Sequence, residues 1–273
     1  MVMNAASQSP IHTFAVCAYG DSPFLPECLE SVCSQAEPSR VLVATSTPSE
    51  YISSQAEKFG VPVFVNKSKP GIASDWNFAL SCVETPLATV AHQDDVYLES
   101  YSRSLLEAAS KTNNLLIYFT NYEEIRDEGI VSDNELLSVK RKLLCSLQDG
   151  RNSNSVRTRR RVLSLGSPIC CPSVSYFLPR LPSPLFEETM KCSLDWQTWE
   201  RLSKLDGDFY YDTNILMRHR IHEESETSHL IADNTRSAED LEMLCKFWPR
   251  PVAKIINHFY AKSQQSNSTQ STS

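Results

Sequence analysis

Glycine is scarce in this 273-residue sequence: seven glycines occur, and no group of them forms a phosphate-binding loop. The spaced glycines of a dinucleotide-binding fingerprint are missing, and so is a glycine loop that ends in Gly-Lys-Ser or Gly-Lys-Thr. These absences argue against dinucleotide oxidoreductases and P-loop NTPases. A nucleotide bound here would need another way to neutralise its phosphates, and a divalent cation held by carboxylates is the usual one.

Long apolar runs and a signal peptide are also missing. No run approaches the roughly 18 apolar residues that span a bilayer, and the N-terminus lacks a basic start followed by an apolar stretch. We therefore expect a cytoplasmic protein without a transmembrane segment, with peripheral attachment to the inner face of the membrane as an open alternative.

An excess of basic residues is lacking too, because the formal net charge is −7. A nucleic-acid partner is therefore not expected, since such surfaces concentrate Lys and Arg. The densest basic run is Arg157 with Arg159 to Arg161. A solvated helix or loop face explains this run, and a contact with an anionic acceptor or membrane surface is the alternative.

Cysteine is plentiful, but its pattern is not that of a disulfide or zinc framework. The nine cysteines are irregularly spaced, their number is odd, and no Cys-x-x-Cys pair occurs. Several lie in apolar runs, among them Cys17, Cys82 and Cys145. We therefore predict reduced, buried thiols.

The first 120 residues alternate short β-rich runs with amphipathic stretches, which is typical of βαβ units and a mostly parallel sheet. Strands are expected at Thr13 to Ala18, Val41 to Thr45, Val61 to Val65, Leu87 to Ala91 and Leu115 to Thr120. Helices are expected at Pro23 to Ser34, Ser49 to Phe59, Ile72 to Cys82 and Glu99 to Ser110. Ligands of such sheets lie at the carboxyl ends of the strands. Residues that directly follow each strand are therefore the first candidates for a site.

The second half reads as an elaboration of this sheet. We expect a hairpin at Asp127 to Gly129, a helical region from Glu135 to Leu165, a helix from Asp195 to Leu205, short strands at Phe209 to Tyr211 and Ile215 to Ile221, and two helices flanking Trp248 to Pro251. The segment from about Ser263 is rich in Ser, Gln, Asn and Thr, so we predict a disordered tail.

The run His92-Gln93-Asp94-Asp95 directly follows an apolar strand. Two adjacent acids at the carboxyl edge of a sheet can hold a divalent cation. The alternative is structural: Asp95 caps the following turn and His92 is a satisfied core imidazole.

Two further elements could carry chemistry. Arg218, Arg220 and His222 alternate after a β-like run, so they could share one face against a diphosphate or form a charged edge strand. Asp195 begins an aromatic helix, where an acid either stabilises the helix start or serves as a general base. The neighbouring Trp196 could stack on a sugar ring, although core packing is the commoner use of tryptophan.

In this order the features resemble the family 2 glycosyltransferases of the GT-A fold. The similar segments are Ala15 to Tyr19 with Leu29 to Gln35, Gly71 to Asn77, His92 to Asp95 in place of the family's Asp-x-Asp-Asp motif, Asp195-Trp196, and Arg220-Ile221-His222. The resemblance covers nearly the whole chain up to the tail.

The resemblance implies a hexosyltransferase-like enzyme of the kind that serves polysaccharide biosynthesis. It would be a single GT-A domain over residues 1–262, with a Rossmann-like central sheet flanked by helices, a donor half at about 11–120, an acceptor half at about 121–235 and terminal helices at 236–262. The reaction would be an inverting transfer from a nucleoside-diphosphate sugar to a hydroxyl of a glycan, lipid-linked or other acceptor.

The resemblance also assigns roles to residues. Asp195 would be the base, and Asp95 with His222 would hold Mn²⁺ or Mg²⁺, with His92 as a further candidate ligand. The donor would be bound by Ala18, Tyr19, Thr45, Asp75, Asn77, Gln93 and Asp94. The acceptor side would include Trp196, Cys171 and Arg220, and we expect Gly166 to Ser173 to form part of its wall.

The sequence departs from the family pattern at three places. His92 replaces the leading aspartate, Trp76 replaces an arginine before Asn77, and no acid follows the second strand at Ala44 to Thr47. A non-catalytic module that binds sugar nucleotides or glycans on the same fold is therefore an alternative. A nucleotidyltransferase is a further one, although the glycine-rich basic loop it needs after the first strand is missing.

Overall fold

The computed structural model describes residues 10–222 and 235–269, and one mixed sheet forms its centre. The strands are β1 (His12–Ala18), β2 (Arg40–Thr45), β3 (Val63–Val65), β4 (Leu87–His92), β5 (Val96–Tyr97), β6 (Leu115–Arg126), β7 (Gly129–Val131), β8 (Val174–Phe177) and β9 (Asp208–Arg220). Their order is β3-β2-β1-β4-β8-β6-β9-β5, with β7 paired to β6. The predicted α/β class is confirmed.

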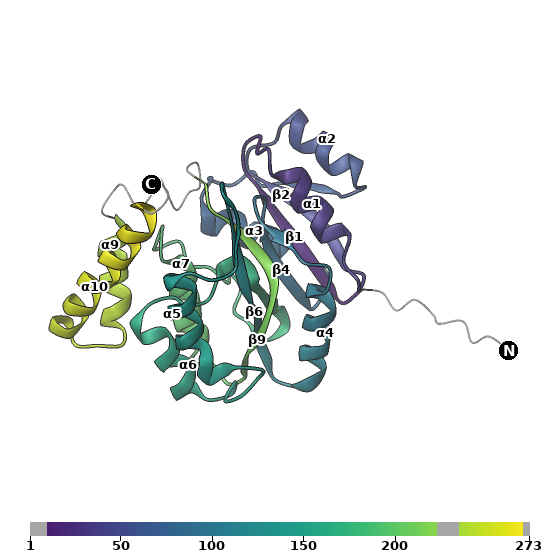
Figure 1. The fold of residues 1–273 in the computed structure, drawn as a ribbon. Helices are drawn as coiled ribbons and strands as arrows, with labels where there is room; N and C mark the ends of the chain where they lie inside the picture. The colour runs from purple at the N-terminus through teal and green to yellow at the C-terminus, as the bar shows by residue number, and fades with distance from the viewer. Residues whose placement is uncertain (1–9, 223–234, 270–273) are drawn as a thin grey trace.

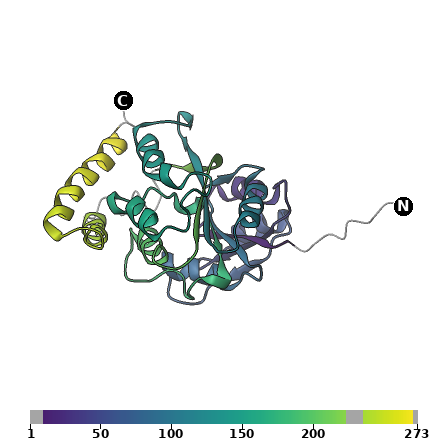
Figure 2. The same ribbon diagram turned by 90° about the horizontal axis from the view of Figure 1, so that it is seen from below.

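Helices cover both faces of this sheet (Figures 1 and 2). They are α1 (Leu25–Cys33), α2 (Glu50–Lys58), α3 (Ile72–Ser81), α4 (Tyr101–Lys111), α5 (Glu135–Leu144), α6 (Val156–Val162), α7 (Leu194–Leu202), α9 (Thr235–Cys245) and α10 (Arg250–Thr269). Single 3₁₀ turns are η1 (Cys145–Leu147), η2 (Leu163–Leu165), η3 (Cys171–Ser173) and η4 (Leu178–Arg180).

Alternation along β1 explains why helices pack on both sides of it. Phe14 and Val16 join the core under α1, α2 and α4, whereas Ala15 packs with Ala79 of α3 on the opposite face. A strand buried on both faces reads as a continuous apolar run, as β1 does. Burial of apolar side chains on the two faces is the main source of stability for this half of the chain.

The parallel register brings three strand ends to one edge. Cys17 of β1 lies opposite Ala44 of β2 and opposite His92 of β4. The residues that follow β1, β2 and β4 are therefore neighbours in space, although they are far apart in sequence.

The strand prediction for the second half is wrong. The two short strands expected on either side of residues 212–214 are one strand, β9, which stays paired with β6 through register shifts around Asn121. Thr213 and Asn214 bulge out of this strand, and Asp212 Oδ1 accepts hydrogen bonds from both the backbone and the side chain of Asn214. The alternation of side chains is lost at such a bulge, so the sequence reads as a break.

The C-terminal part differs from expectation in extent. Helices α9 and α10 form an antiparallel pair at one margin of the molecule (Figure 1). Helix α10 continues to Thr269, so the backbone predicted to be disordered from Ser263 is helical that far, and residues 270–273 lie outside the described residues. Among the described helices, none has the length and hydropathy needed to cross a bilayer.

Candidate active site

His92, Asp94 and Asp95 converge at the end of β4. A tight turn, closed by a hydrogen bond from Asp95 N to His92 O (3.2 Å), folds the three side chains together. One ligand atom from each lies within 4.8 Å of the others. The sequence segment therefore forms a compact cluster at the carboxyl edge of the sheet.

Asp95 is fully buried and held by β9. Its Oδ1 accepts hydrogen bonds from His219 Nδ1 (2.8 Å) and from the backbone N–H of Arg220 (2.9 Å). Its Oδ2 has no hydrogen-bond partner among the described residues and lies 3.7 Å from His92 Nδ1. His92 Nε2 is likewise buried without a partner in the described chain. Two unpartnered polar atoms in one cluster fit a site that a ligand completes.

The chemistry of this cluster suits a divalent cation. Carboxylate oxygens are ligands that Mg²⁺ and Mn²⁺ accept, and imidazole shifts the preference toward transition metals. The unpartnered Oδ2 of Asp95 lies 3.7 Å from His92 Nδ1, within a group of closely spaced ligand atoms, so the residues present fit a cation.

His219 was not singled out from the sequence, yet it contacts the most buried acid of the cluster. Burial alone would lower the pKa of His219, but the charge of Asp95 and the hydrogen bond to it raise the pKa above its ordinary value. The alternation pattern had grouped Arg218 with Arg220 and His222 instead. Of these, Arg218 is bound by β6, because its Nε donates to Glu123 Oε1 (2.7 Å).

Asp94 faces the end of β9 from the other side. His222 Nε2 lies 3.0 Å from Asp94 Oδ2, so the predicted late histidine meets Asp94. Burial alone would raise the pKa of Asp94, but the charges of His92 and His219 and the His222 hydrogen bond lower it. This carboxylate is therefore charged and already adjacent to two imidazoles.

Arg220 lies on the α1 side of this cluster. Its guanidinium packs 4.4 Å from the ring centroid of Phe24, ion-pairs with Glu27 and donates from Nε to the backbone carbonyl of Asp94 (3.0 Å). Its predicted acceptor-side role conflicts with these contacts, because the side chain is committed to α1 and to the Asp94 backbone. Arg220 instead holds the turn that carries Asp94.

The predicted donor residues after β1 and β2 are brought together around Gln93. The Gln93 amide accepts from Tyr19 N (3.0 Å) and donates to Tyr19 O (2.8 Å), so it ties the β4 turn to the β1 loop. Gly20, with a φ of 62°, donates its N–H to Thr47 Oγ1 (2.7 Å). Thr45 is buried and its hydroxyl accepts from Thr47 N (3.0 Å). The loops after β1 and β2 thus form one rigid edge, next to Ala18.

A carboxylate does lie beside the end of β2, although none follows that strand in sequence. Asp75 of α3 accepts from Ser46 Oγ (3.0 Å) and from Asn66 Nδ2 (2.8 Å). Polar side chains from the ends of β2 and β3 and from α3 are therefore joined in one hydrogen-bond network at the edge.

Asn77 has a different position from the one predicted. Its Oδ1 accepts from the backbone N–H groups of Leu185 (3.0 Å) and Phe186 (2.9 Å), and its Nδ2 donates to Phe186 O (2.8 Å). Its hydrogen-bonding groups are thereby used to clamp the segment that follows η4. A donor-binding role for its side chain would require breaking this clamp.

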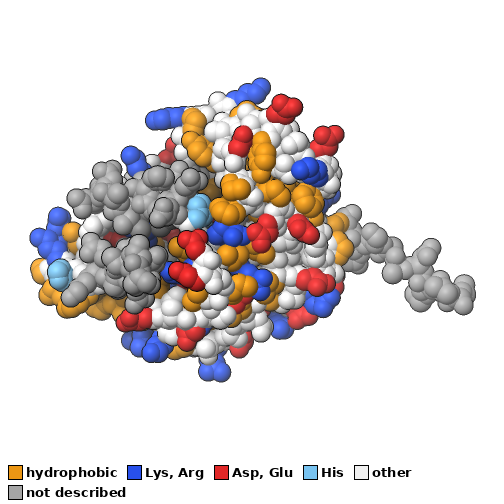
Figure 3. Space-filling model, turned by 45° about the horizontal axis from the view of Figure 1, so that its top comes forward, with side chains coloured by type: hydrophobic (Ala, Val, Ile, Leu, Met, Phe, Trp, Pro, Cys, Tyr) orange, Lys and Arg blue, Asp and Glu red, His pale blue; other side chains and the backbone are white. Residues whose placement is uncertain are grey.

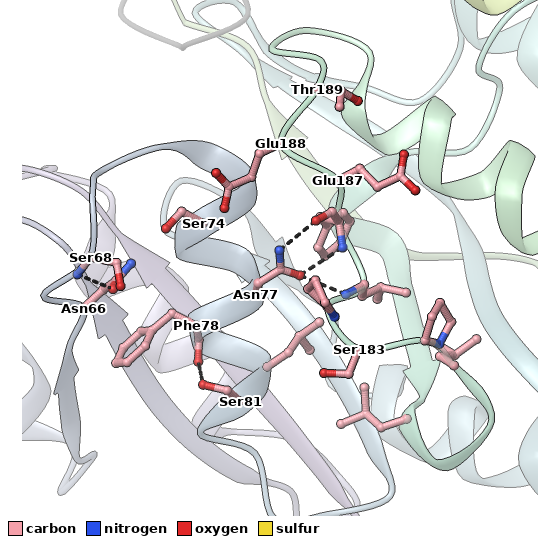
Figure 4. A pocket seen from close by; sticks show the side chains of 17 residues that line it. Asn66, Ser68, Ser74, Asn77, Phe78, Ser81, Ser183, Glu187, Glu188 and Thr189 are labelled. Carbon is pink, nitrogen blue, oxygen red and sulfur yellow. Dashed lines mark hydrogen bonds between the residues drawn. The ribbon is translucent and has the colours of Figure 1, made fainter.

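The clamped segment and α3 enclose a cavity of about 750 Å³, shown in Figure 4. Ser74 and Glu188 lie at one end, Ser81 and Ser183 at the other, and Asn77 between them. None of the cluster residues at the end of β4, nor Asp195, lines this cavity. We therefore locate the candidate site at the sheet edge and not in this cavity.

Asp195 lies in the first turn of α7, and its Oδ1 accepts from Trp196 N (2.6 Å). Burial raises the pKa of Asp195, against the lowering effects of the Trp196 amide and of the Arg236 and Lys140 charges. The preceding backbone is fixed by Glu239 of α9, which accepts from three successive N–H groups, those of Lys191, Cys192 and Ser193. The sequence places an acid here, but it gives no sign of this anchor.

Trp196 does not line an acceptor site. Its ring is 1% exposed, its Nε1 donates to Leu163 O (3.0 Å), and it packs beside Phe247 and Tyr260. Of the two uses left open for this tryptophan, the structure shows core packing, which argues against its expected acceptor-side role.

The cysteines are free thiols, as predicted. Burial and the charge of Asp195 raise the pKa of Cys171 well above its ordinary value, so this acceptor-side candidate is an uncharged neighbour of the acid and no nucleophile. The prediction of burial is wrong for Cys33, Cys145 and Cys245, which are exposed.

A family model described as "Glycosyl transferase family 2" matches residues 13–178. S. aureus TarS 1-349 superposes with a TM-score of 0.62 at 11% identity, covering 91% of this chain and 69% of that one. The mannosyltransferase PcManGT of Pyrobaculum calidifontis, in complex with GDP-Man and Mn²⁺, superposes with a TM-score of 0.62 at 13% identity. The match covers 93% of this chain and 70% of that one. Glucosyl-3-phosphoglycerate synthase of Mycobacterium tuberculosis superposes with a TM-score of 0.53 at 14% identity, and the match covers 86% of this chain and 79% of that one. No curated protein gives a significant sequence match.

Proposed function

Because this chain belongs to glycosyl transferase family 2, we propose that it moves a sugar from a nucleoside-diphosphate sugar to an acceptor hydroxyl with inversion at the anomeric carbon. The convergence of His92, Asp94 and Asp95 at the carboxyl edge carries this proposal. A cluster of this kind can hold the diphosphate end of the donor, while the loops after β1 and β2 lie beside it for the nucleoside.

The donor half comprises about residues 11–120. Two of the similar structures hold UDP-GlcNAc or GDP-Man, which supports a sugar nucleotide as donor. Within this half Asp75 is the carboxylate available to accept a hydrogen bond from a base N–H, in place of an acid after β2. Tyr19, which is 58% exposed, offers a ring for stacking at the same edge.

The cation would be held by Asp94, Asp95 and His92, with His222 beside Asp94. A divalent cation at this point supplies charge for the two phosphates of the donor and for the departing diphosphate. Of the two acids, Asp94 is the better placed to reach both a cation and the donor, because Asp95 is fully buried and its Oδ1 is already occupied by β9. Asp95 then contributes its remaining oxygen, Oδ2.

The base would be Asp195. As an acceptor hydroxyl attacks the anomeric carbon, its proton passes to the Asp195 carboxylate, and the bond from that carbon to the diphosphate oxygen breaks with its electron pair. Attack from the face opposite the leaving group inverts the anomeric centre. A raised pKa makes this carboxylate a stronger base than an ordinary aspartate, which suits proton abstraction near neutral pH.

The acceptor half comprises about residues 121–235, with η3 and the start of α7 forming its wall. A non-catalytic module would need neither a half-buried acid with a raised pKa nor the Glu239 anchor that fixes the backbone before it. These features favour an enzyme over a binding module.

Donor turnover tests the proposal. Wild type, Asp195→Asn and the exposed control Asp127→Asn are incubated with UDP-, GDP- and TDP-sugars and Mn²⁺, and nucleoside diphosphate release is measured. We expect release from at least one donor by wild type and control, and a loss of about 10²-fold or more in Asp195→Asn. A wild type that is inert toward every donor would favour the binding module.

A further inference from the structure

The C-terminal helix α10 has an exposed apolar row on the side that faces away from the protein. Ile255 is 61% exposed, Phe259 67% and Val252 40%. Residues 252, 255 and 259 recur at helical spacing, whereas Ala253 and Asn257 on the opposite side are buried against the rest of the chain. Helix α10 therefore packs one face against the protein and also exposes apolar side chains along part of its outer face.

Basic side chains lie along one side of this row. Helix α10 contains no Asp or Glu, and Arg250, Lys254 and His258 are exposed on it. This stands against a formal charge of −7 for the whole chain. On the neighbouring α9, Glu239 is bound to backbone N–H groups and Asp240 is buried, while Glu242 remains exposed.

The end of α6 extends the same surface. It carries the arginine run found in the sequence, whose members divide into engaged and exposed side chains. Arg159 points inward and donates to the backbone carbonyls of Gly207 and Leu205, and Arg160 pairs with Glu200. Arg157 and Arg161 are exposed.

Two hydrogen bonds join α6 and η2 to the connection between α9 and α10. Trp248 Nε1 donates to Ser164 O (2.7 Å), and Arg160 donates to Lys246 O (3.1 Å). The exposed Leu165 therefore adjoins Trp248. In Figure 3 hydrophobic and basic side chains occur together at the left margin, where α10 lies.

We propose that this surface, called here the α10 surface, docks on an anionic lipid bilayer, with its apolar row at the boundary between headgroups and acyl chains and its basic side chains against lipid phosphates. Its members are Leu165, Trp248, Val252, Ile255 and Phe259 with Arg161, Arg250 and Lys254. An amphipathic helix with aromatic and aliphatic residues beside Lys and Arg is the arrangement that binds in the plane of a membrane. The opposite sign of the chain as a whole orients this face toward an anionic surface.

A second copy of the chain fits this surface less well. A stable dimer buries about 800 Å² on each partner, which one helix face with a few apolar side chains does not supply. The proposal does not depend on the glycosyl transfer chemistry.

Vesicle sedimentation of the full chain tests the proposal. The vesicles contain phosphatidylcholine alone or phosphatidylcholine and phosphatidylglycerol in equal parts. The variants are Ile255→Glu/Phe259→Glu, the charge variant Arg250→Gln/Lys254→Gln, and the control Ile130→Glu, which changes a 52% exposed side chain on β7. Because the substituted side chains are exposed, all variants should keep the melting temperature of wild type.

Wild type and Ile130→Glu should sediment with the anionic vesicles and stay in solution with phosphatidylcholine alone. The affinity of the Ile255→Glu/Phe259→Glu variant for the anionic vesicles should fall by about tenfold or more. The charge variant should lose most of its preference for anionic vesicles over phosphatidylcholine vesicles. Wild type remaining in the supernatant, or equal binding by the apolar-row variant, overturns the proposal. So does a wild-type dimer in analytical ultracentrifugation that the apolar-row variant dissociates, because the face is then a self-association surface.

Discussion

Trp76 stacks on His92. The ring centroids are 5.1 Å apart with an interplanar angle of 22°, and Phe186 contacts the indole from its edge at 4.9 Å. Trp76 stands where the family resemblance implies an arginine, and His92 stands where it implies the leading aspartate. Two of the three departures therefore form one contact, in which two aromatic rings stand together where the family resemblance implies an arginine and an aspartate.

A double-mutant cycle of Trp76→Ala and His92→Ala should show that this contact is coupled. We expect the two losses in unfolding free energy to be non-additive by about 0.5–1.5 kcal/mol, because stacked aromatic pairs contribute that much beyond burial. Urea unfolding of the four proteins in EDTA measures the coupling. Additive losses would mean that the rings are neighbours without a shared contribution.

The effect of His92→Asp on stability should depend on the residue at position 76. His92→Asp alone places a third carboxylate beside Asp94 and Asp95 and against an indole, so it should lower the melting temperature in EDTA. Trp76→Arg in the same chain supplies a compensating charge and should recover part of the loss. If His92→Asp alone is as stable as the double variant, the two positions are independent.

Asp195→Asn should make the protein more stable while it removes activity. Burial raises the pKa of Asp195, so the folded state holds a proton more tightly than the unfolded chain. The stability associated with that proton is present in acid and is lost as pH rises from the ordinary aspartate pKa of 3.8 through the raised pKa. Asparagine keeps the acceptor for Trp196 N without the charge. Chemical denaturation at pH 7 should therefore show a gain over wild type, and a loss would contradict the raised pKa.

The same shift predicts the pH profile of the reaction. Only the carboxylate can accept the proton of the acceptor hydroxyl, so kcat should fall in acid with a midpoint above the ordinary aspartate value. A rate that is flat through this range in wild type would separate Asp195 from the chemistry.

Stability below neutral pH should be limited by His12. This ring is fully buried between Ser39 and Thr89, with 2.8 Å hydrogen bonds to both hydroxyls, and burial lowers its pKa to about 3. The folded state resists protonation of this ring. The stability that the neutral His12 contributes is therefore present above pH 6.5 and is lost as pH falls from 6.5 toward 3. The slope from this one group is at most about 1.4 kcal/mol per pH unit.

His12→Gln should reduce that slope, whereas the control His258→Gln, on the exposed face of α10, should leave it unchanged. Urea midpoints at several pH values between 4 and 7 provide the comparison. Equal slopes in wild type and His12→Gln would contradict a neutral buried ring.

The first half of the chain could be predicted because its signals are local. The apolar spacing of Leu25, Cys28, Leu29 and Val32 is the buried face of α1, and Ser49 caps α2 by accepting from Ile52 N. Strands β1, β2 and β4 are short apolar runs, and their common carboxyl edge follows from parallel pairing alone.

The contacts that complete the site depend on pairing between distant segments. His219 reaches Asp95 because β5 pairs with β9 in one register, Val96 opposite Arg218, and nothing local specifies that register. The same holds for Asp75, which reaches Ser46 from another element, and for Glu239, which anchors the backbone before Asp195. Trp196 could not be assigned to core or acceptor until Leu163, Phe247 and Tyr260 were placed around it.

The most direct test of the central claim is calorimetric titration of a sugar nucleotide into the protein with Mn²⁺ or with EDTA. Wild type and the control Asp127→Asn should bind UDP- or GDP-sugars at least about tenfold more tightly with Mn²⁺, and Mg²⁺ should help less because imidazole favours the transition metal. Asp94→Asn should lose most of the Mn²⁺ effect. Equal affinity with Mn²⁺ and with EDTA in wild type, or an undiminished Mn²⁺ effect in Asp94→Asn, would contradict a cation-assisted donor site at the end of β4.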